Sequence, residues 1–245
     1  MWELGLGLGA LSVPHYRGSD HSYHWLLPIP YVVYRGELFR RDREGTRAVL
    51  LDTETVDIDL SVDGSPPARS RDDRARIGLP DLAAALELGP NVKVRLGKGP
   101  GWKLELQLPV RAAVSLERNP KSLGWTFNPV LNLDVEWQAW NLTLQGGPLA
   151  ASQRYNEYFY SVAPAYATST RPAYAARAGY AGWGLACGAT RRVGDYWIGG
   201  FARYDSLQGA TFAPSPLVTS RNNFTVGLAV SWVFAVSQTR VPDRR

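Results

Sequence analysis

The stretch "GWKLELQLPVRAAVS", residues 101–115, decides the fold of this chain. Its even positions, beginning with Trp102, are all apolar. Its odd positions include Lys103, Glu105 and Arg111. Successive side chains of a strand point to opposite faces, so this strand has one apolar and one charged face. In a soluble sandwich the apolar face would cover a core, whereas in a membrane barrel it would face lipid and the charged face a lumen.

The same alternation recurs along the whole chain of 245 residues. No helical period is convincing, and no apolar run reaches the roughly 18 residues that a membrane-spanning helix needs. The alternation predicts twelve strands, at residues 2–10, 25–35, 37–41, 46–51, 56–62, 82–96, 102–115, 123–135, 137–145, 179–190, 195–205 and 224–234.

The links between these strands alternate between two kinds. Most of one set are long, at 12–24, 42–45, 64–80, 116–122, 146–178 and 206–221. The other set is short, at 35–36, 52–55, 97–100, near 136, and 191–194. Long loops at one end, tight turns at the other and an even strand number are typical of an outer-membrane barrel. A sandwich has no reason to sort its loops in this way, although a soluble sandwich or lipocalin-like barrel remains the alternative on pattern alone.

We therefore expect an all-β, closed antiparallel transmembrane barrel over residues 1–236, with a flexible tail at 237–245 and both termini on the short-turn side. Hydrophobic residues make up 45% of the chain, and the single cysteine excludes an internal disulfide. The net charge of +5 comes partly from mixed runs at 39–44 and 68–76, which indicate solvated loops and no nucleic-acid partner. Strand-like sequence follows Met1 directly, so we expect that an export signal has been removed.

Several segments together resemble one family of Gram-negative outer-membrane barrels. They are "WELGLGLGALSVPHYRGSD" at 2–20, "LLPIPYVVYRG" at 26–36, "IGLPDLAAALELG" at 77–89, "YFYSVAP" at 158–164 and "SPLVTSRNNFTVGLAVSWVF" at 215–234. In matching order they are similar to the MipA/OmpV family, named for an MltA-interacting protein. The resemblance implies a scaffold that holds a lytic transglycosylase and a peptidoglycan synthase, with no catalytic residues. Family members tend to end at the aromatic residue here represented by Phe234, whereas this chain continues for eleven residues.

The only three histidines, His15, His21 and His24, fall in the first long loop. Together with Asp20 they could bring two imidazoles and a carboxylate to one metal, and with Ser19 they could form a hydrolytic site. The surrounding composition is that of an ordinary loop, and no other loop offers a histidine. We therefore expect neither a metal site nor a catalytic site, and no cofactor.

Three functional classes fit a barrel: a scaffold, a small-solute channel, and a surface receptor or adhesin that uses the 146–178 loop. The scaffold would dock peptidoglycan enzymes on its short turns and tail, and its outside would contact outer-membrane lipid and lipopolysaccharide. Opposite charges on the inner face should pair and narrow the bore, and the tyrosines of the 146–178 loop should pack over the mouth. The residues expected to line the lumen are Lys103, Glu105, Arg111, Asn128, Asn132, Asp134, Asp57 and Asp59.

Overall fold

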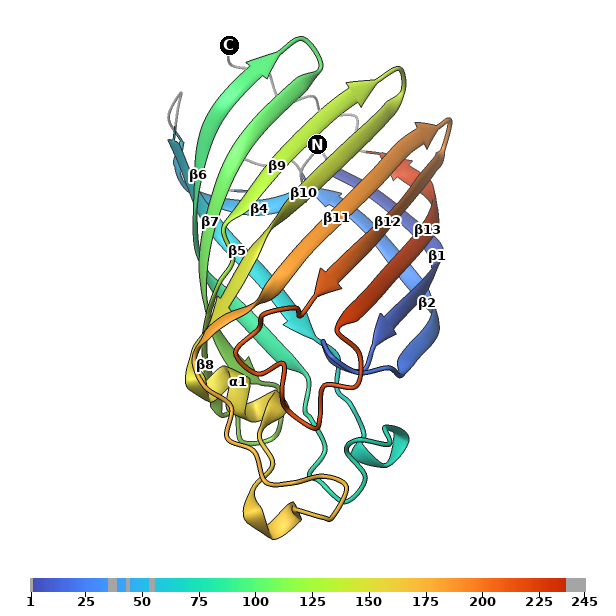
Figure 1. Cartoon of the computed structure of the whole chain (residues 1–245). Coiled ribbons are helices and arrows are strands. Elements are labelled where there is room, and N and C mark those ends of the chain that lie inside the picture. The colour runs from blue at the N-terminus through green and yellow to red at the C-terminus, as the bar shows by residue number, and fades with distance from the viewer. Residues whose placement is uncertain (1, 35–38, 43–44, 53–55, 237–245) are drawn as a thin grey trace.

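The computed structural model describes residues 2–34, 39–42, 45–52 and 56–236, most of which lie in strands (Figure 1). The short links predicted at 35–36 and 52–55 and the tail predicted at 237–245 lie wholly or partly outside the described residues. The strands are β1 (Trp2–Pro14), β2 (Ser22–Tyr34), β3 (Phe39–Asp42), β4 (Gly45–Asp52), β5 (Val56–Ser65), β6 (Ala85–Gly99), β7 (Trp102–Ser115), β8 (Ser122–Phe127), β9 (Val130–Trp137), β10 (Trp140–Ala151), β11 (Gly179–Val193), β12 (Tyr196–Ser206) and β13 (Asn222–Val236).

All strands belong to one antiparallel sheet. Its order is β2-β1-β13-β12-β11-β10-β8-β7-β6-β5-β4-β3, and β9 follows β8 between β7 and β10. The first and last strands of the chain are neighbours, with Leu8 opposite Val230. The sheet curls so that β4 and β5 lie behind β10 and β11 in Figure 1, and its end strands β2 and β3 contact each other.

The strand predicted at 123–135 is two strands in the structure. β8 and β9 are separated by Asn128 and Pro129, so the described residues contain thirteen strand elements where twelve were predicted. Proline has no N–H to donate to a ladder, which explains the break. Asn128, in the break, donates its side-chain amide to the carbonyl of Pro148 on β10 over 2.7 Å. The pairing of β10 keeps one register on both sides of the break, with Gly146 opposite Leu131 and Ala150 opposite Phe127.

The described connections are sorted by length, as the sequence predicted. Tight turns join β6 to β7, β9 to β10 and β11 to β12 at the end of the sheet where β1 begins and β13 ends. Gly101 and Gly194 have φ angles of 78° and 56° in two of these turns, a left-handed conformation that glycine adopts without strain. The long loops lie at the opposite end, at residues 15–21, 66–84, 116–121, 152–178 and 207–221.

One long loop contains a helix that the sequence analysis missed. Helix α1 (Gln153–Tyr160) begins after Ser152, whose side chain accepts a hydrogen bond from the backbone of Tyr155. Two short 3-10 turns, at Ser70–Asp72 and Pro164–Tyr166, lie in the loops. Among the described residues, no helix has both the length and the hydropathy to cross a membrane.

Large apolar side chains cover one face of the sheet. The exposed fractions of Leu6, Leu8, Leu228 and Phe224 are 60%, 61%, 63% and 65%. A continuous apolar surface of this kind is unfavourable in water and favourable against hydrocarbon. Trp102, Val226 and Val230, which alternate with small or polar residues in the sequence, are also exposed.

Candidate functional site

On the side of the sheet away from the exposed apolar face, strands β5, β6 and β7 carry buried charged side chains, which we call the polar wall. Lys93 forms an ion pair with Asp59 at 2.9 Å, and both side chains are buried. Arg95 approaches Asp57 at 3.6 Å on the same strand pair. A buried charge is tolerated when an opposite charge compensates for its lost hydration, so these pairs explain how the wall can carry charge.

The polar wall continues across β7 and β9. Lys103 lies opposite Asp134 in the ladder and forms an ion pair with Glu105 at 3.2 Å. Asp134 accepts hydrogen bonds from Asn132 at 2.6 Å and from the hydroxyl of Thr143 at 2.7 Å. These contacts therefore link side chains of three neighbouring strands, β7, β9 and β10.

A second group of charges lies closer to the long loops. Arg111 donates to the hydroxyl of Ser61 at 2.8 Å and approaches Asp63 at 3.6 Å. On the other side of the interior, Arg203 donates two hydrogen bonds, of 2.8 and 3.0 Å, to the carboxylate of Asp205. The loop residue Arg17 reaches the same carboxylate at 3.1 Å.

The structure places the eight predicted lumen residues on this polar face. Seven belong to β5, β7 and β9, and Asn128 lies in the break between β8 and β9. Sequence reasoning missed Arg17, Arg203 and Asp205, although the spacing of Arg203 and Asp205 places both on one face of β12. Arg17 belongs to a loop, where no period indicates the direction of a side chain.

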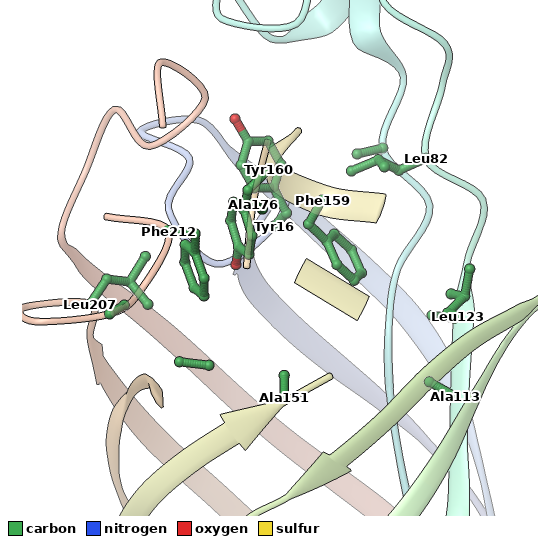
Figure 2. Packing of buried hydrophobic residues seen from close by; sticks show 14 residues of the cluster. Tyr16, Leu82, Ala113, Leu123, Ala151, Phe159, Tyr160, Ala176, Leu207 and Phe212 are labelled. Carbon is green, nitrogen blue, oxygen red and sulfur yellow. The ribbon is translucent and has the colours of Figure 1, made fainter. Parts of the chain in front are cut away.

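Four of the long loops, at residues 15–21, 66–84, 152–178 and 207–221, pack together into a cap, which Figure 2 shows at the loop end of the sheet. At its centre the rings of Tyr160 and Phe212 stack with their centroids 3.6 Å apart, and Tyr16 lies beside them. Of the aromatic residues predicted to pack in the 146–178 loop, Tyr166 is 40% exposed and stays at the surface. The others, Tyr155, Tyr158, Phe159, Tyr160 and Tyr174, all belong to this cluster or contact it.

Helix α1 also joins the cap to the polar wall. The hydroxyl of Tyr155 donates to Glu87 at 2.7 Å, and Thr126 donates to the other oxygen of the same carboxylate at 2.7 Å. Burial raises the pKa of Tyr155 well above its usual value. The phenol therefore stays protonated and acts as a donor at physiological pH.

The mixed-charge run at 68–76 is not simply a solvated loop, so that expectation was wrong. Asp73 and Arg76 are buried. Arg76 donates to the carbonyls of Phe159 and Pro80, each at 3.1 Å, and thereby fastens this loop to α1. The sequence gives no signal for this, because the partners are backbone carbonyls of distant loops.

His15 and His21 lie close together, with ring centroids 5.8 Å apart, but His24 does not join them. His15 is buried, with its Nδ1 atom 3.4 Å from Asp73. His21 contacts Asp20 at 2.9 Å, and His24 is exposed on β2. The described residues contain no group of three or more potential metal ligands.

The serine of this loop is not arranged as a nucleophile. Ser19 donates its hydroxyl to Asp73 and to the backbone carbonyl of His21, and not to a histidine ring. A hydrolytic serine needs a base that can take its proton, with an acid behind that base. In this cluster the carboxylate stands between the hydroxyl and the imidazole, an arrangement suited to joining loops 15–21 and 66–84.

Between the cap and the second group of charges lies a cavity of about 570 Å³. A smaller polar cavity of about 100 Å³ adjoins it, and both are lined by Arg17, Arg111 and Arg203. The larger cavity also has an apolar lining, which includes Leu11, Trp25, Leu149, Phe159, Tyr160, Phe201 and Phe212.

Comparison with known proteins places this architecture among outer-membrane proteins. A family profile described as "MltA-interacting protein MipA" matches residues 6–234. Outer membrane protein OmpV of Vibrio cholerae serotype O1 (strain ATCC 39315 / El Tor Inaba N16961) is 26% identical over 222 residues, which cover 89% of this chain and 81% of that protein.

Two solved structures resemble the fold at low sequence identity. A bacterial polysaccharide outer membrane secretin aligns with a TM-score of 0.49 and 9% identity, covering 95% of this chain and 99% of that one. The NanC porin aligns with a TM-score of 0.41 and 8% identity, covering 94% and 98% of the two chains.

Proposed function

The chain belongs to the MipA family of MltA-interacting proteins and is an outer-membrane β-barrel protein of Gram-negative type, and from this premise we propose that it is a closed barrel that works as a scaffold. Its periplasmic partner is a lytic transglycosylase, together with a peptidoglycan synthase. The observation that carries the proposal is the family match over residues 6–234, because the family description names an interaction with MltA, a lytic transglycosylase.

The order of the strands supports closure at the short-turn end. With β8 and β9 counted as one broken strand, the sheet has twelve positions, and its two end strands β2 and β3 contact each other. An open edge in hydrocarbon leaves N–H and C=O groups unsatisfied at a cost of several kcal/mol each. Pairing of β2 with β3 near the short turns would remove that cost.

The interior favours a scaffold over an open channel. The charges of the polar face are paired, and the cap covers the loop end with buried side chains. The surface exposed to the periplasm is then that of the tight turns. Exposed residues there include Lys98, Gln138, Asp195 and Tyr196.

We further propose that lipid and lipopolysaccharide surround the barrel. The exposed apolar face would contact hydrocarbon, and the loop end would contact the phosphates of lipopolysaccharide. Exposed arginines at that end, suited to bidentate contacts with phosphate, are Arg69, Arg71, Arg74, Arg118, Arg154, Arg177 and Arg221.

Site-specific photocrosslinking in intact cell envelopes tests the scaffold. A photoreactive residue at Gln138, in a tight turn, should trap a peptidoglycan-remodelling enzyme. The matched control is Gln208, a glutamine that is also exposed and lies in a long loop, which should not trap it. Capture from Gln208 and not from Gln138 would contradict the proposal, as would capture of no envelope enzyme from any tight turn.

A further inference from the structure

We propose that the cavity beneath the cap binds an amphipathic acid from the membrane, a molecule with one carboxylate head and a hydrocarbon body. The head would meet the three arginines, and the body would lie along the aromatic and aliphatic lining. A volume of about 570 Å³ falls within the range of about 300 to 1,000 Å³ typical of small-molecule sites.

The three arginines have hydrogen-bond donors to spare. Each guanidinium carries five N–H groups. Arg17 approaches Asp205 through Nε alone, and its two terminal nitrogens have no hydrogen-bond partner among the described residues. Arg203 uses Nε and Nη2 on Asp205, and Arg111 uses Nε on Ser61. The site therefore has N–H groups that can still donate hydrogen bonds to an acceptor on a ligand.

The carboxylates that line the same cavity are already engaged. Asp205 is held by Arg203 and Arg17, as described above. Glu87 accepts from two hydroxyls. Asp63 accepts from the backbone N–H of Gly64 at 2.8 Å and approaches Arg111. These contacts leave little reason for a cationic ligand and favour an anionic head, for which charge-assisted bonds to guanidinium are strong.

The rest of the cavity is suited to a hydrocarbon body. Phe159, Tyr160 and Phe212 line the cavity on the side of the cap, and all three are buried. Trp25 and Phe201 line it from β2 and β12. An apolar body placed against these rings would be removed from water, which is the main source of affinity in such sites.

Two strand edges point to the membrane as the source of this ligand. From Leu60 to Ser65, β5 has one ladder partner in the described part of the chain, β6, because β4 reaches only Asp57 to Asp59. From Tyr23 to Pro30, β2 likewise has β1 alone. Residues 28 and 30 of that edge are prolines, which lack the N–H that an edge would leave unpaired.

The cavity reaches these two edges. Trp25 from β2 and Ser65 from β5 line it, together with Pro14 and Pro66 at the adjoining strand ends. A molecule that lies in the bilayer beside β2 and β5 would therefore meet the apolar lining before any other part of the interior. This route favours a membrane-soluble acid over a small anion from the aqueous phase.

The test uses the full chain in nanodiscs of phosphatidylcholine and dodecanoate labelled with ¹³C at its carboxyl carbon. We expect one saturable site per barrel, detected as a separate carboxyl resonance. Because arginine favours the ionised head, the bound resonance should stay ionised to a lower pH than that of dodecanoate dissolved in the bilayer. Dodecanol, which lacks the charge, should compete at least about tenfold more weakly.

Two variants separate the head from the body. Arg111→Gln should weaken binding about tenfold or more, and Arg192→Gln, at an exposed arginine beside a tight turn, should leave it unchanged. Leu149→Trp fills the cavity without removing a charge and should abolish the bound resonance. Leu144→Trp, on the exposed face of the same strand, is its control.

Each of three results would overturn the proposal. They are equal competition by dodecanol and dodecanoate, binding that survives Leu149→Trp, and displacement of dodecanoate by acetate at similar concentration. The first would mean that no anionic head is recognised, the second that the acid binds elsewhere, and the third that the ligand comes from water.

Discussion

His15 is a buried titratable group at the junction of two cap loops. Burial lowers its pKa, and nearby His21 acts in the same direction. Asp73 and Asp72 act in the opposite direction, yet burial is the largest effect. The imidazole is therefore less ready to take a proton in the folded cap than in an unfolded loop.

The sign of the resulting pH dependence follows from proton binding. An unfolded loop containing His15 takes up a proton near the ordinary histidine pKa of about 6.5, whereas the folded cap takes it up only at lower pH. The stability of the cap is therefore complete above about pH 6.5 and falls as the pH drops below it. Hydrogen exchange of residues 66–84, corrected for intrinsic rates, should show weaker protection at pH 5 than at pH 8.

Substitution distinguishes His15 from the other histidines. His15→Gln should remove most of this pH dependence. His24→Gln should leave it intact, because His24 is exposed on β2. Equal protection at the two pH values in the unmodified protein would contradict the assignment.

The sequence predicts the face of the sheet on which a side chain lies better than it predicts the partner of that side chain. Period-two alternation assigned Asp59 and Glu105 to the polar face, because the face of a strand residue is fixed by its parity. The partners could not be predicted in the same way. Asp205 is shared by Arg203 of its own strand and by Arg17 of a loop, and only the folded loop brings Arg17 there.

Strands were predicted well, and the elements in the loops were not. The strands are long and alternate over their whole length, so local sequence and the membrane impose the same pattern. The break between β8 and β9 depends on Pro129, whose effect on an otherwise regular strand was not anticipated. Helix α1 has only eight residues and is stabilised by packing of Phe159 and Tyr160 in the cap, which a periodicity analysis cannot detect.

Strand β7 provides a direct test of the two faces. Leu106→Arg should impair membrane insertion, because a cation on the lipid face near the bilayer midplane costs about 2 to 4 kcal/mol. Gln107→Arg, one residue further, should be tolerated, since Gln107 adjoins the polar cavity. Heat-modifiable migration in gels after refolding into lipid vesicles measures the folded fraction. Equal losses for both variants would mean that the faces are misassigned.

The complete molecule combines a paired interior, a packed cap at one end and tight turns at the other. The sequence predicted this asymmetry from loop lengths alone, because short and long links alternate along an antiparallel sheet. It did not predict the cavity, which exists where cap residues such as Tyr160 fail to fill the space above Arg111 and Arg203. A cavity depends on how distant segments pack together, so the pattern of residues within one segment cannot predict it.

This arrangement predicts that the barrel does not conduct freely. A closed barrel of twelve strands would enclose a space between that of an eight-stranded barrel, filled by side chains, and that of a sixteen-stranded porin. Strand number alone therefore leaves conduction open, and the contents of the lumen decide it. The ion pairs Lys93–Asp59 and Lys103–Glu105 lie on the polar face, and the cap packs at the loop end of the sheet.

Planar-bilayer recordings of the purified protein should accordingly show no steady conductance. Phe212→Ala should loosen the cap, because loss of a buried phenylalanine costs about 3 to 5 kcal/mol, and should produce brief openings. Phe224→Ala, at a side chain 65% exposed on the outer face, should not. Steady ion-selective channels in the unmodified protein, with a selectivity that shifts when Lys103 or Arg111 is neutralised, would instead establish a channel, since only groups that line a conducting path can change its selectivity.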